Sequence, residues 1–343
     1  MSGDTITLAH GAGGAAMTEL IDQVFRPAFH NEWLDENEDQ ARLPVDWLKQ
    51  PGDRLAFSTD SYVISPLTFP GGDIGKLAVC GTLNDLAVGG AIPRYLSISF
   101  ILEEGMPLAL LRQIVASMES VLAAHQVLVV TGDTKVVPRG KGDQVYINTT
   151  GIGVIPGHRQ LSQGSIRKGD LLLVNGPVGN HGAVIADVRE LLGFSTHLHS
   201  DCASLCAMID TVLDAFPGRI RCLRDATRGG LAAVSNEFAR GAAKHLQFRE
   251  QDLPVAEPVA AICELLGFDP LYLANEGNAL WVVDPAVAHD AVAVMRDFSE
   301  GAGAAIIGQA LGDHATGWVT VKNALGTARM VDLPVGELLP RIC

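Results

Sequence analysis

Four aspartates in the N-terminal half of the chain stand where an unpaired charge is costly, which marks them as candidates for chemistry. They follow apolar stretches, lie in a glycine turn or interrupt an apolar segment: Asp60, Asp73, Asp85 and Asp133. Buried carboxylates are usually hydrogen-bonded, paired or bound to a cation. Each one alone could cap a helix or a turn. Four in so short a stretch favour Mg²⁺, which takes oxygen ligands and keeps substrate phosphates in its shell.

Polar residues beside two of these aspartates could complete such a site. Asn84 precedes Asp85, and Thr134 and Lys135 follow Asp133. A lysine supplies positive charge for a phosphate group. Aspartates on Mg²⁺ and Lys135 on phosphate would together let an acidic protein hold ATP.

A glycine-rich turn, Gly11-Ala12-Gly13-Gly14, lies between a predicted strand and a predicted helix. Its pattern approaches the Rossmann fingerprint, which needs a second strand ending in an acidic residue. The segment 31–40 is polar and acidic instead, and no Gly-Lys-Ser/Thr follows for a phosphate loop of the Walker type. The turn is therefore either a general anion site at a helix N-terminus or a plain turn.

Two further groups lie in the second half of the chain. Asp225 and Arg228 belong to a charged turn, 224–230, which favours an anion or substrate clamp, with a capped helix as the alternative. Glu276 interrupts an apolar segment and could act as a general base, or it could lie in an ordinary bulge.

The six cysteines form no C-x-x-C pair, and Cys202 and Cys206 fit two core thiols better than a metal site. Cys343 follows a segment with two prolines that we expect to be a flexible tail. About twelve extended residues could reach 35–40 Å, enough to bring this thiol into a neighbouring domain. The alternative is an incidental cysteine.

Hydrophobic patterning predicts an α/β (α+β) protein with mixed sheets in two domains, 1–155 and 156–330, followed by the tail 331–343. For the first domain we predict strands at 5–9, 54–64, 94–102, 127–137 and 144–155, with helices at 15–29, 74–91 and 107–126. For the second we predict a strand and turn at 167–179, strand halves within 271–285 and strands at 304–311 and 317–321. Its predicted helices are 181–193, 202–216, about 230–240, 255–267 and 286–298.

The composition excludes some classes of function. A net charge of −14 with no basic patch argues against nucleic acid as a partner. The first ten residues show no signal-peptide pattern, and no apolar stretch is long enough for a membrane span. We therefore expect a cytoplasmic protein.

The motifs together strongly resemble the hydrogenase maturation factor family HypE. They run from HGAGG at 10–14 through the long segment 58–97, GDTKVV, SDCA, DATRGGLA and NEGN to the final Pro340-Arg341-Ile342-Cys343. The chain is also similar to the wider family of aminoimidazole ribonucleotide synthetases, selenophosphate synthetases and thiamine-phosphate kinases.

The resemblance implies a homodimer that holds ATP and Mg²⁺ near the interface of its N-terminal domains. It implies that a carbamoyltransferase, HypF, carbamoylates Cys343, and that ATP-dependent dehydration turns this S-carboxamide into a thiocyanate. The cyano group would pass to a HypC–HypD complex for the iron of [NiFe]-hydrogenase.

On this basis we assign Mg-ATP to Asp60, Asp85, Asp73 and Asp225. Asp133 and Lys135 would flank the phosphates, and Glu276 would be the base. Gly11, Gly13, Gly14, Asn84, Thr134 and Arg228 complete the expected nucleotide site.

Two alternatives remain open. A selenophosphate synthetase would want a reactive cysteine near its N-terminus, whereas the first here is Cys80, within a predicted helix. A non-catalytic scaffold that delivers a thiol-bound ligand would not need the aspartates. ATP hydrolysis, measured with and without a carbamoylated tail, would separate the scaffold from the enzyme.

Overall fold

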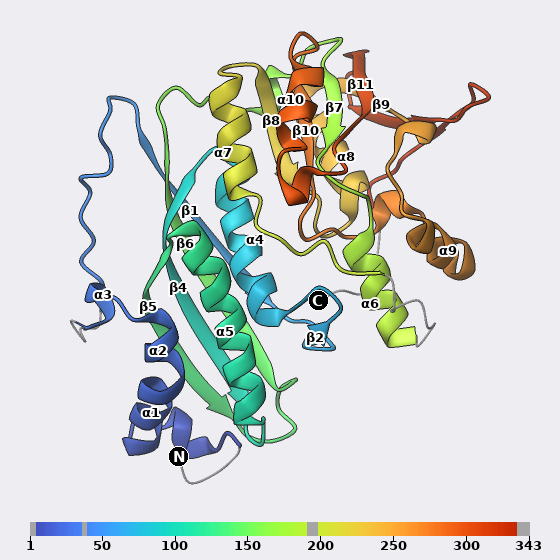
Figure 1. The fold of residues 1–343 in the computed structure, drawn as a ribbon. Coiled ribbons are helices and arrows are strands. Elements are labelled where there is room, and N and C mark those ends of the chain that lie inside the picture. The colour runs from blue at the N-terminus through green and yellow to red at the C-terminus, as the bar shows by residue number, and fades with distance from the viewer. Residues whose placement is uncertain (1–4, 36–39, 191–197, 335–343) are drawn as a thin grey trace.

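Four strands of the N-terminal domain form a mixed sheet in the computed structural model, which describes residues 5–35, 40–190 and 198–334 (Figure 1). Their order is β1–β6–β4–β5, and only β4 and β5 run parallel. The strands are β1 (Arg54–Tyr62), β4 (Ile92–Glu103), β5 (Leu128–Val137) and β6 (Val145–Ile155). All four coincide with predicted strands to within a few residues.

Helices α4 (Ile74–Val88) and α5 (Leu108–His125) cover one face of this sheet (Figure 1). Most of α4 is buried because it contacts β1 and β6, α5 and the C-terminal domain. Two glycines allow this close packing. A Cβ atom at Gly75 would overlap the carbonyl oxygen of Ile114, and one at Gly81 would overlap the hydroxyl of Tyr62. Gly75 thus lets α4 pack closely on α5, and Gly81 lets it pack closely on β1. This packing sets the positions of Asn84 and Asp85 on α4.

The opposite face of the sheet, here termed the open face, keeps several apolar side chains exposed within the described residues, and Trp47 packs against Tyr95 on it. Its exposed apolar side chains are Leu55, Phe57, Ile101 and Leu128, and Phe57 is 71% exposed. Such a face is unusual for a monomer in water, because contiguous apolar surface commonly marks an interaction site.

The N-terminal segment differs from the prediction. Residues 5–9 form only an isolated bridge between Thr5 and Pro107, followed by a 3₁₀ turn at Leu8–Gly11. The segment is tied down by single hydrogen bonds, such as that from the Ile6 N–H to the Met106 carbonyl (2.8 Å), so no ladder extends it. The predicted helix 15–29 is present as α1 (Ala15–Leu20), a π-helical turn and α2 (Arg26–Phe29), and a short α3 (Glu32–Asp35) follows.

The C-terminal domain is built on a second mixed sheet, which has seven strands within the described residues (Figure 1). Their order is β13–β12–β9–β11–β7–β10–β8, and β9 and β12 run parallel. The strands are β7 (Leu171–Val174), β8 (Ile220–Asp225), β9 (Lys244–Arg249), β10 (Ala279–Val283), β11 (Ala305–Asp313), β12 (Trp318–Lys322) and β13 (Ala328–Met330). Strands β8, β9 and β13 were not predicted, and of the strand halves in 271–285 only β10 forms.

Helices cover both faces of this second sheet. Leu172 and Val174 of β7 point into the core beneath α8 (Gly230–Ala242), whereas Leu173 belongs to the core beneath α7 (Cys206–Ala215) and α10 (Ala288–Met295). Helices α6 (Asn180–Glu190) and α9 (Glu257–Leu266) pack together at one end. A short hairpin, β2 (Thr68–Phe69) and β3 (Gly72–Asp73), precedes α4.

The two domains share one hydrophobic core, which continues from the α4–α5 layer into the α7–α10 layer. Arg159, in the connecting segment, is 5% exposed and ties both sides together. Its guanidinium donates to Asp210 and Asp214 of α7 (2.6 Å each) and to the carbonyl of Gly90 behind α4 (3.2 Å). The domains therefore meet through a packed interface with a buried cation at its edge.

The predicted tail, 331–343, begins inside the folded C-terminal domain. Val331 is buried and its carbonyl accepts from Asn236 (2.9 Å), so the C-terminal body includes this residue. The rest of the predicted tail from 335, with Cys343, lies outside the described residues. Among the described helices, none combines the length and apolar character needed to cross a membrane.

Candidate functional site

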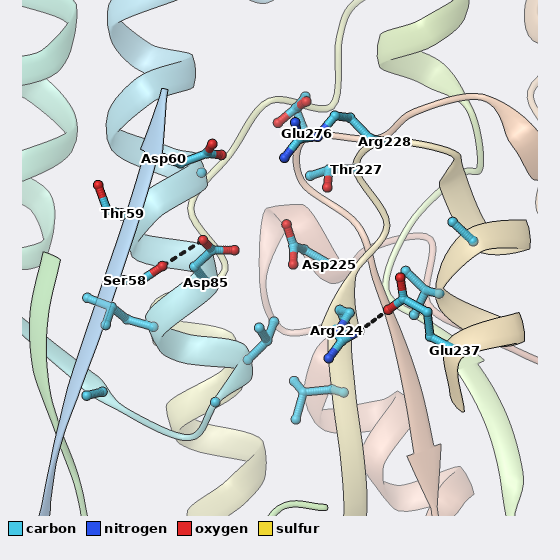
Figure 2. A pocket seen from close by; sticks show the side chains of 18 of the residues that line it. Ser58, Thr59, Asp60, Asp85, Arg224, Asp225, Thr227, Arg228, Glu237 and Glu276 are labelled. Atoms are coloured by element: carbon cyan, nitrogen blue, oxygen red, sulfur yellow. Dashed lines mark hydrogen bonds and ion pairs between the residues drawn. The ribbon is translucent and has the colours of Figure 1, made fainter. Parts of the chain in front are cut away.

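A cavity of about 920 Å³ lies between the two domains (Figure 2). Strand β1 and helix α4 line it on one side, and β8 and α8 line it on the other. It brings together five of the predicted site residues: Asp60, Asp85, Asp225, Arg228 and Glu276. Figure 2 shows their side chains directed toward the same space from β1, from α4, from the end of β8 with the turn after it, and from the loop at Glu276.

The N-terminal side of the cavity carries Asp60 on β1 and Asp85 on α4. The hydroxyl of Ser58 donates to Asp85 (2.8 Å), and the Ser61 N–H donates to Asp60 (2.8 Å). Burial raises the pKa of Asp85, and the nearby Asp60 charge raises it further, while the Ser58 hydrogen bond partly opposes both.

The C-terminal side carries Asp225, at the end of β8, and Glu276, just before β10. Burial raises the pKa of Asp225 to about 7, and the charge of Asp85 adds to this effect. Burial also raises the pKa of Glu276 well above its ordinary value, with contributions from Cys202, Asp201, Asp225 and Asp60. Four acidic groups thus repel one another across the cavity, an arrangement that favours binding of a cation.

Two arginines lie near these acids but differ in availability. Arg224 forms an ion pair with Glu237 of α8 and lies over the ring of Phe238 (5.8 Å to the centroid). Arg228 makes no hydrogen bond or ion pair with any residue that the structure describes. Arg228 is therefore free to contact an anionic ligand in the cavity.

The acids fit magnesium by their chemistry, although they do not form a closed cage. Among the described residues, no three His, Cys, Asp or Glu side chains are grouped closely enough to hold a metal ion by themselves. Mg²⁺ is commonly bound by one or two carboxylates together with substrate phosphates and water. The oxygen-only donors Asp60, Asp85 and Asp225 suit that kind of site.

Asp73 and Asn84 lie on or beside α4 but do not line the cavity. Asp73 caps α4: its Oδ1 accepts from the N–H groups of Gly75 (2.8 Å) and Lys76 (2.9 Å) and from Ser117 (2.6 Å). Asp73 therefore fills the helix-cap role that was its alternative. Asn84 is buried, and both of its polar groups bind backbone of the segment 203–205.

The remaining predicted residues form a second group beside β5: Gly11, Gly13, Gly14, Asp133, Thr134 and Lys135. A Cβ atom at Gly11 would lie 2.6 Å from the Val136 nitrogen, so the glycine turn packs directly on this strand. Lys135 pairs with Asp133 (2.7 Å) on the exposed surface. The segment 132–135 lies within β5, inside the predicted strand 127–137.

The two groups are separate within one copy of the chain. Asp60 pairs with Thr149, Thr149 with Ile98, and Ile98 with Gly132. Three strand spacings separate Asp60 from Gly132, which is about 14 Å. Asp133 is next along the strand and points to the open face, whereas Asp60 points to the α4 side. The second group does not reach the cavity of its own chain.

Sequence reasoning missed some residues of the cavity region. Thr227 and Glu237 line the cavity, and Asp201 lies behind Glu276. The signal for Asp201 was present in the motif Ser-Asp-Cys-Ala, but nothing in the sequence shows that it meets a loop 75 residues later. Cys343 lies outside the described residues, so the structure does not place it.

Comparison with known proteins agrees with this architecture. Residues 37–155 match the family described as AIR synthase related protein, N-terminal domain, and residues 167–319 match AIR synthase related protein, C-terminal domain. The fold and the interdomain site thus define a protein of the AIR synthase related class.

Close relatives narrow this class. The chain is 53% identical to carbamoyl dehydratase HypE of Rhodobacter capsulatus, over 99% of this chain and 98% of the relative. A crystal structure of hydrogenase maturation protein HypE in complex with ATP has a TM-score of 0.91 at 44% identity, covering 99% of this chain and all of that one. A HypE–HypF complex has a TM-score of 0.79 at 41% identity, covering 94% of this chain and all of that one. The chain belongs to the HypE family.

Proposed function

We propose that this chain is a carbamoyl dehydratase of hydrogenase maturation, which uses ATP to turn the S-carboxamide of Cys343 into a thiocyanate. The observation that carries the proposal is the meeting of Asp60, Asp85, Asp225 and Glu276 in one cavity between the domains. The relative solved with ATP supports nucleotide binding, and the identity to carbamoyl dehydratases supports the reaction.

The cavity residues divide into two roles. Asp60, Asp85 and Asp225 would hold Mg²⁺, and Arg228 would contact the phosphates. When bound, Mg²⁺ supplies positive charge that offsets the charge developing on the transferred phosphoryl group. Burial, with the charges of its acidic neighbours, raises the pKa of Glu276 well above its ordinary value, which makes its ionised carboxylate a stronger base than one in water. We therefore assign Glu276 as the general base.

The reaction balances with these groups. The amide oxygen of the S-carboxamide attacks the γ-phosphorus of ATP, which releases ADP and makes phosphate the leaving group on carbon. One N–H proton passes to water as the carbon–nitrogen double bond forms. Loss of the second N–H proton to Glu276 and departure of phosphate then leave the thiocyanate. The products are ADP, phosphate and the S–C≡N group. Binding both partners between two domains supplies the alignment that phosphoryl transfer needs.

The second group of predicted residues favours a homodimer. Asp133 and Lys135 point to the open face of the first sheet, which also exposes Leu55 and Phe57. A second copy packed on this face would cover the apolar side chains. We propose that Asp133, Lys135 and the glycine turn at Gly11–Gly14 then act on nucleotide at the interface.

The same proposal requires two partner proteins: one that loads Cys343 and one that accepts the cyano group. A carbamoyltransferase must load Cys343, and the solved HypE–HypF complex of relatives makes HypF the candidate. A HypC–HypD complex would accept the cyano group for the iron of [NiFe]-hydrogenase. These steps would take place in the cytoplasm.

Intact-mass analysis tests the proposal. The chain is incubated with HypF, carbamoyl phosphate and Mg-ATP and sampled over time, beside a Cys343→Ala control. We expect the wild-type chain first to gain one carbamoyl group and then to lose one water, while the control gains nothing. A carbamoylated chain that keeps its water in the presence of hydrolysable ATP would contradict a dehydratase.

A further inference from the structure

The loop that carries Glu276 is held by a carboxylate from another part of the chain. Asp201 lies between α6 and α7, and its Oδ2 accepts hydrogen bonds from the backbone N–H groups of Glu276 (3.2 Å) and Gly277 (3.1 Å). Its Oδ1 accepts from the N–H of His181 (3.1 Å), at the start of α6. One side chain therefore joins the Glu276 loop to the beginning of a helix.

Backbone contacts strengthen the same junction. The N–H of Ala203 donates to the carbonyl of Glu276 (3.3 Å), so both ends of residue 276 are bound by the segment 201–203. A Cβ atom at Gly277 would overlap the carbonyl oxygen of Asp201. The close approach thus requires glycine at 277, and it leaves the Glu276 backbone little freedom.

The segment is in turn anchored to the N-terminal domain by Asn84. Its Nδ2 donates to the carbonyl of Ala203 (3.0 Å), and its Oδ1 accepts from the N–H of Leu205 (2.7 Å). Asn84 directly precedes Asp85 on α4. Hydrogen bonds therefore run from α4 through the segment 201–205 to Glu276, and they relate the position of Glu276 to that of Asp85.

A carboxylate that is partly withdrawn from water is an expensive way to bind backbone amides, because its charge loses part of its hydration. Asp201 is partly buried and forms no ion pair with any described residue, and burial raises its pKa to about 6. Stability alone is therefore a poor explanation for this side chain. Its three N–H contacts, at 3.1–3.2 Å, join the Glu276 loop to the start of α6, which suits a group that must keep that loop in one place.

We propose that Asp201 is a positioning residue for Glu276, with Asn84 as its anchor on α4. The inference rests on the proposed function, in which Glu276 takes a proton from the substrate. Asp201 acts only through the loop that it holds, because it binds three N–H groups and does not line the cavity.

A double-mutant cycle tests this role. The dehydration rate of carbamoylated full-length chain is measured for Asp201→Asn, Glu276→Gln and the double variant. An Asn side chain has one acceptor oxygen, so it cannot bind both His181 and the loop. We expect Asp201→Asn to lower kcat on the order of 10-fold or more, because small misplacement of a catalytic group is costly, and to leave the KM for ATP unchanged. In the Glu276→Gln background it should cause no further loss.

Controls separate this role from lost stability. Asp170→Asn removes a buried aspartate, which pairs with Arg221 (3.1 Å) and does not line the cavity; it should cost stability but leave kcat of the folded enzyme unchanged. If Asp201→Asn does not fold, Asn84→Ala should reproduce the pattern by releasing the anchor.

The possible failures are distinct. Equal losses from Asp201→Asn in both backgrounds, or a loss confined to the KM for ATP, would overturn the positioning role alone. Full activity of Glu276→Gln would overturn the proposed base and this inference with it.

Discussion

Replacing Asp225 by Asn should stabilise the ligand-free protein while it impairs the enzyme. Burial and Asp85 raise the pKa of Asp225 from 3.8 to about 7. In the unfolded chain this group ionises near pH 4, whereas in the native state it keeps its proton until about pH 7. Its contribution to stability is therefore complete below pH 4, is lost as the pH rises to 7, and stays lost above. At about 1.4 kcal/mol per pH unit, the cost at pH 8 is up to about 4 kcal/mol.

The assay is thermal unfolding from pH 4.5 to 8 with a chelator and no nucleotide. If half of the cost is relieved, the midpoint of Asp225→Asn at pH 8 should rise by about 3 °C, since an unfolding entropy of about 2.1 cal/mol/K per residue makes each kcal/mol worth roughly 1.4 °C in a chain of 343 residues. The gain should shrink toward pH 4. Asp170→Asn, which leaves Arg221 short of a partner in a buried pair, should lower the midpoint instead. A lower midpoint for Asp225→Asn at pH 8 would refute the reasoning about repulsion among the cavity acids.

Three further outcomes are expected. Asp85→Asn keeps an oxygen to accept from Ser58, so the fold should persist while ATP turnover falls on the order of 10²-fold; unchanged hydrolysis would remove Asp85 from the site. Cys343→Ala should end thiocyanate formation but preserve Mg-ATP binding in calorimetry, because the candidate nucleotide residues lie elsewhere; carbamoylation mapped by peptide mass to a buried cysteine such as Cys80 or Cys202 would contradict this. Phe57→Glu places a charge on the open sheet face and should shift the protein to monomer in light scattering, whereas a dimer that tolerates it would argue for another interface.

Local patterns predicted most of the N-terminal domain because its elements carry clear signals. Strands β4 and β6 alternate buried and partly exposed residues, and α5 has a long apolar stripe. Strand β8 was missed because its arginines hide the pattern: Arg221 is buried in a pair with Asp170, which lies 51 residues away in the sequence. An ion pair of that kind follows from tertiary contacts and leaves no local signal.

The candidate site was predictable in its residue types but not in its grouping. Asp60, Asp85, Asp225 and Glu276 stood out as acids in apolar or glycine-rich surroundings, and the structure brings them into one cavity. Asp73 has the same local signal, yet it caps a helix. Only the packing of α4 on β1 decides that Asp85 faces the cavity whereas Asp73 caps the helix. For Asp133 and Lys135, the separation from Asp60 depends on strand order, which the sequence of one strand does not contain.

The buried guanidinium of Arg159 has a consequence for exchanging parts between relatives. The family matches suggest two exchangeable modules, 37–155 and 167–319, but Arg159 lies between them and needs acceptors from both: Gly90 on one side, and Asp210 and Asp214 on the other. A chimera joined at the module boundary must carry all of these acceptors and the facing surfaces of α4 and α7, or it will bury an unpaired cation beside mismatched apolar surfaces. Chimeras that fold should therefore have their junctions outside this set of contacts. Substitutions at Arg159, at its acceptors and on the facing surfaces of α4 and α7 should accordingly occur together in relatives.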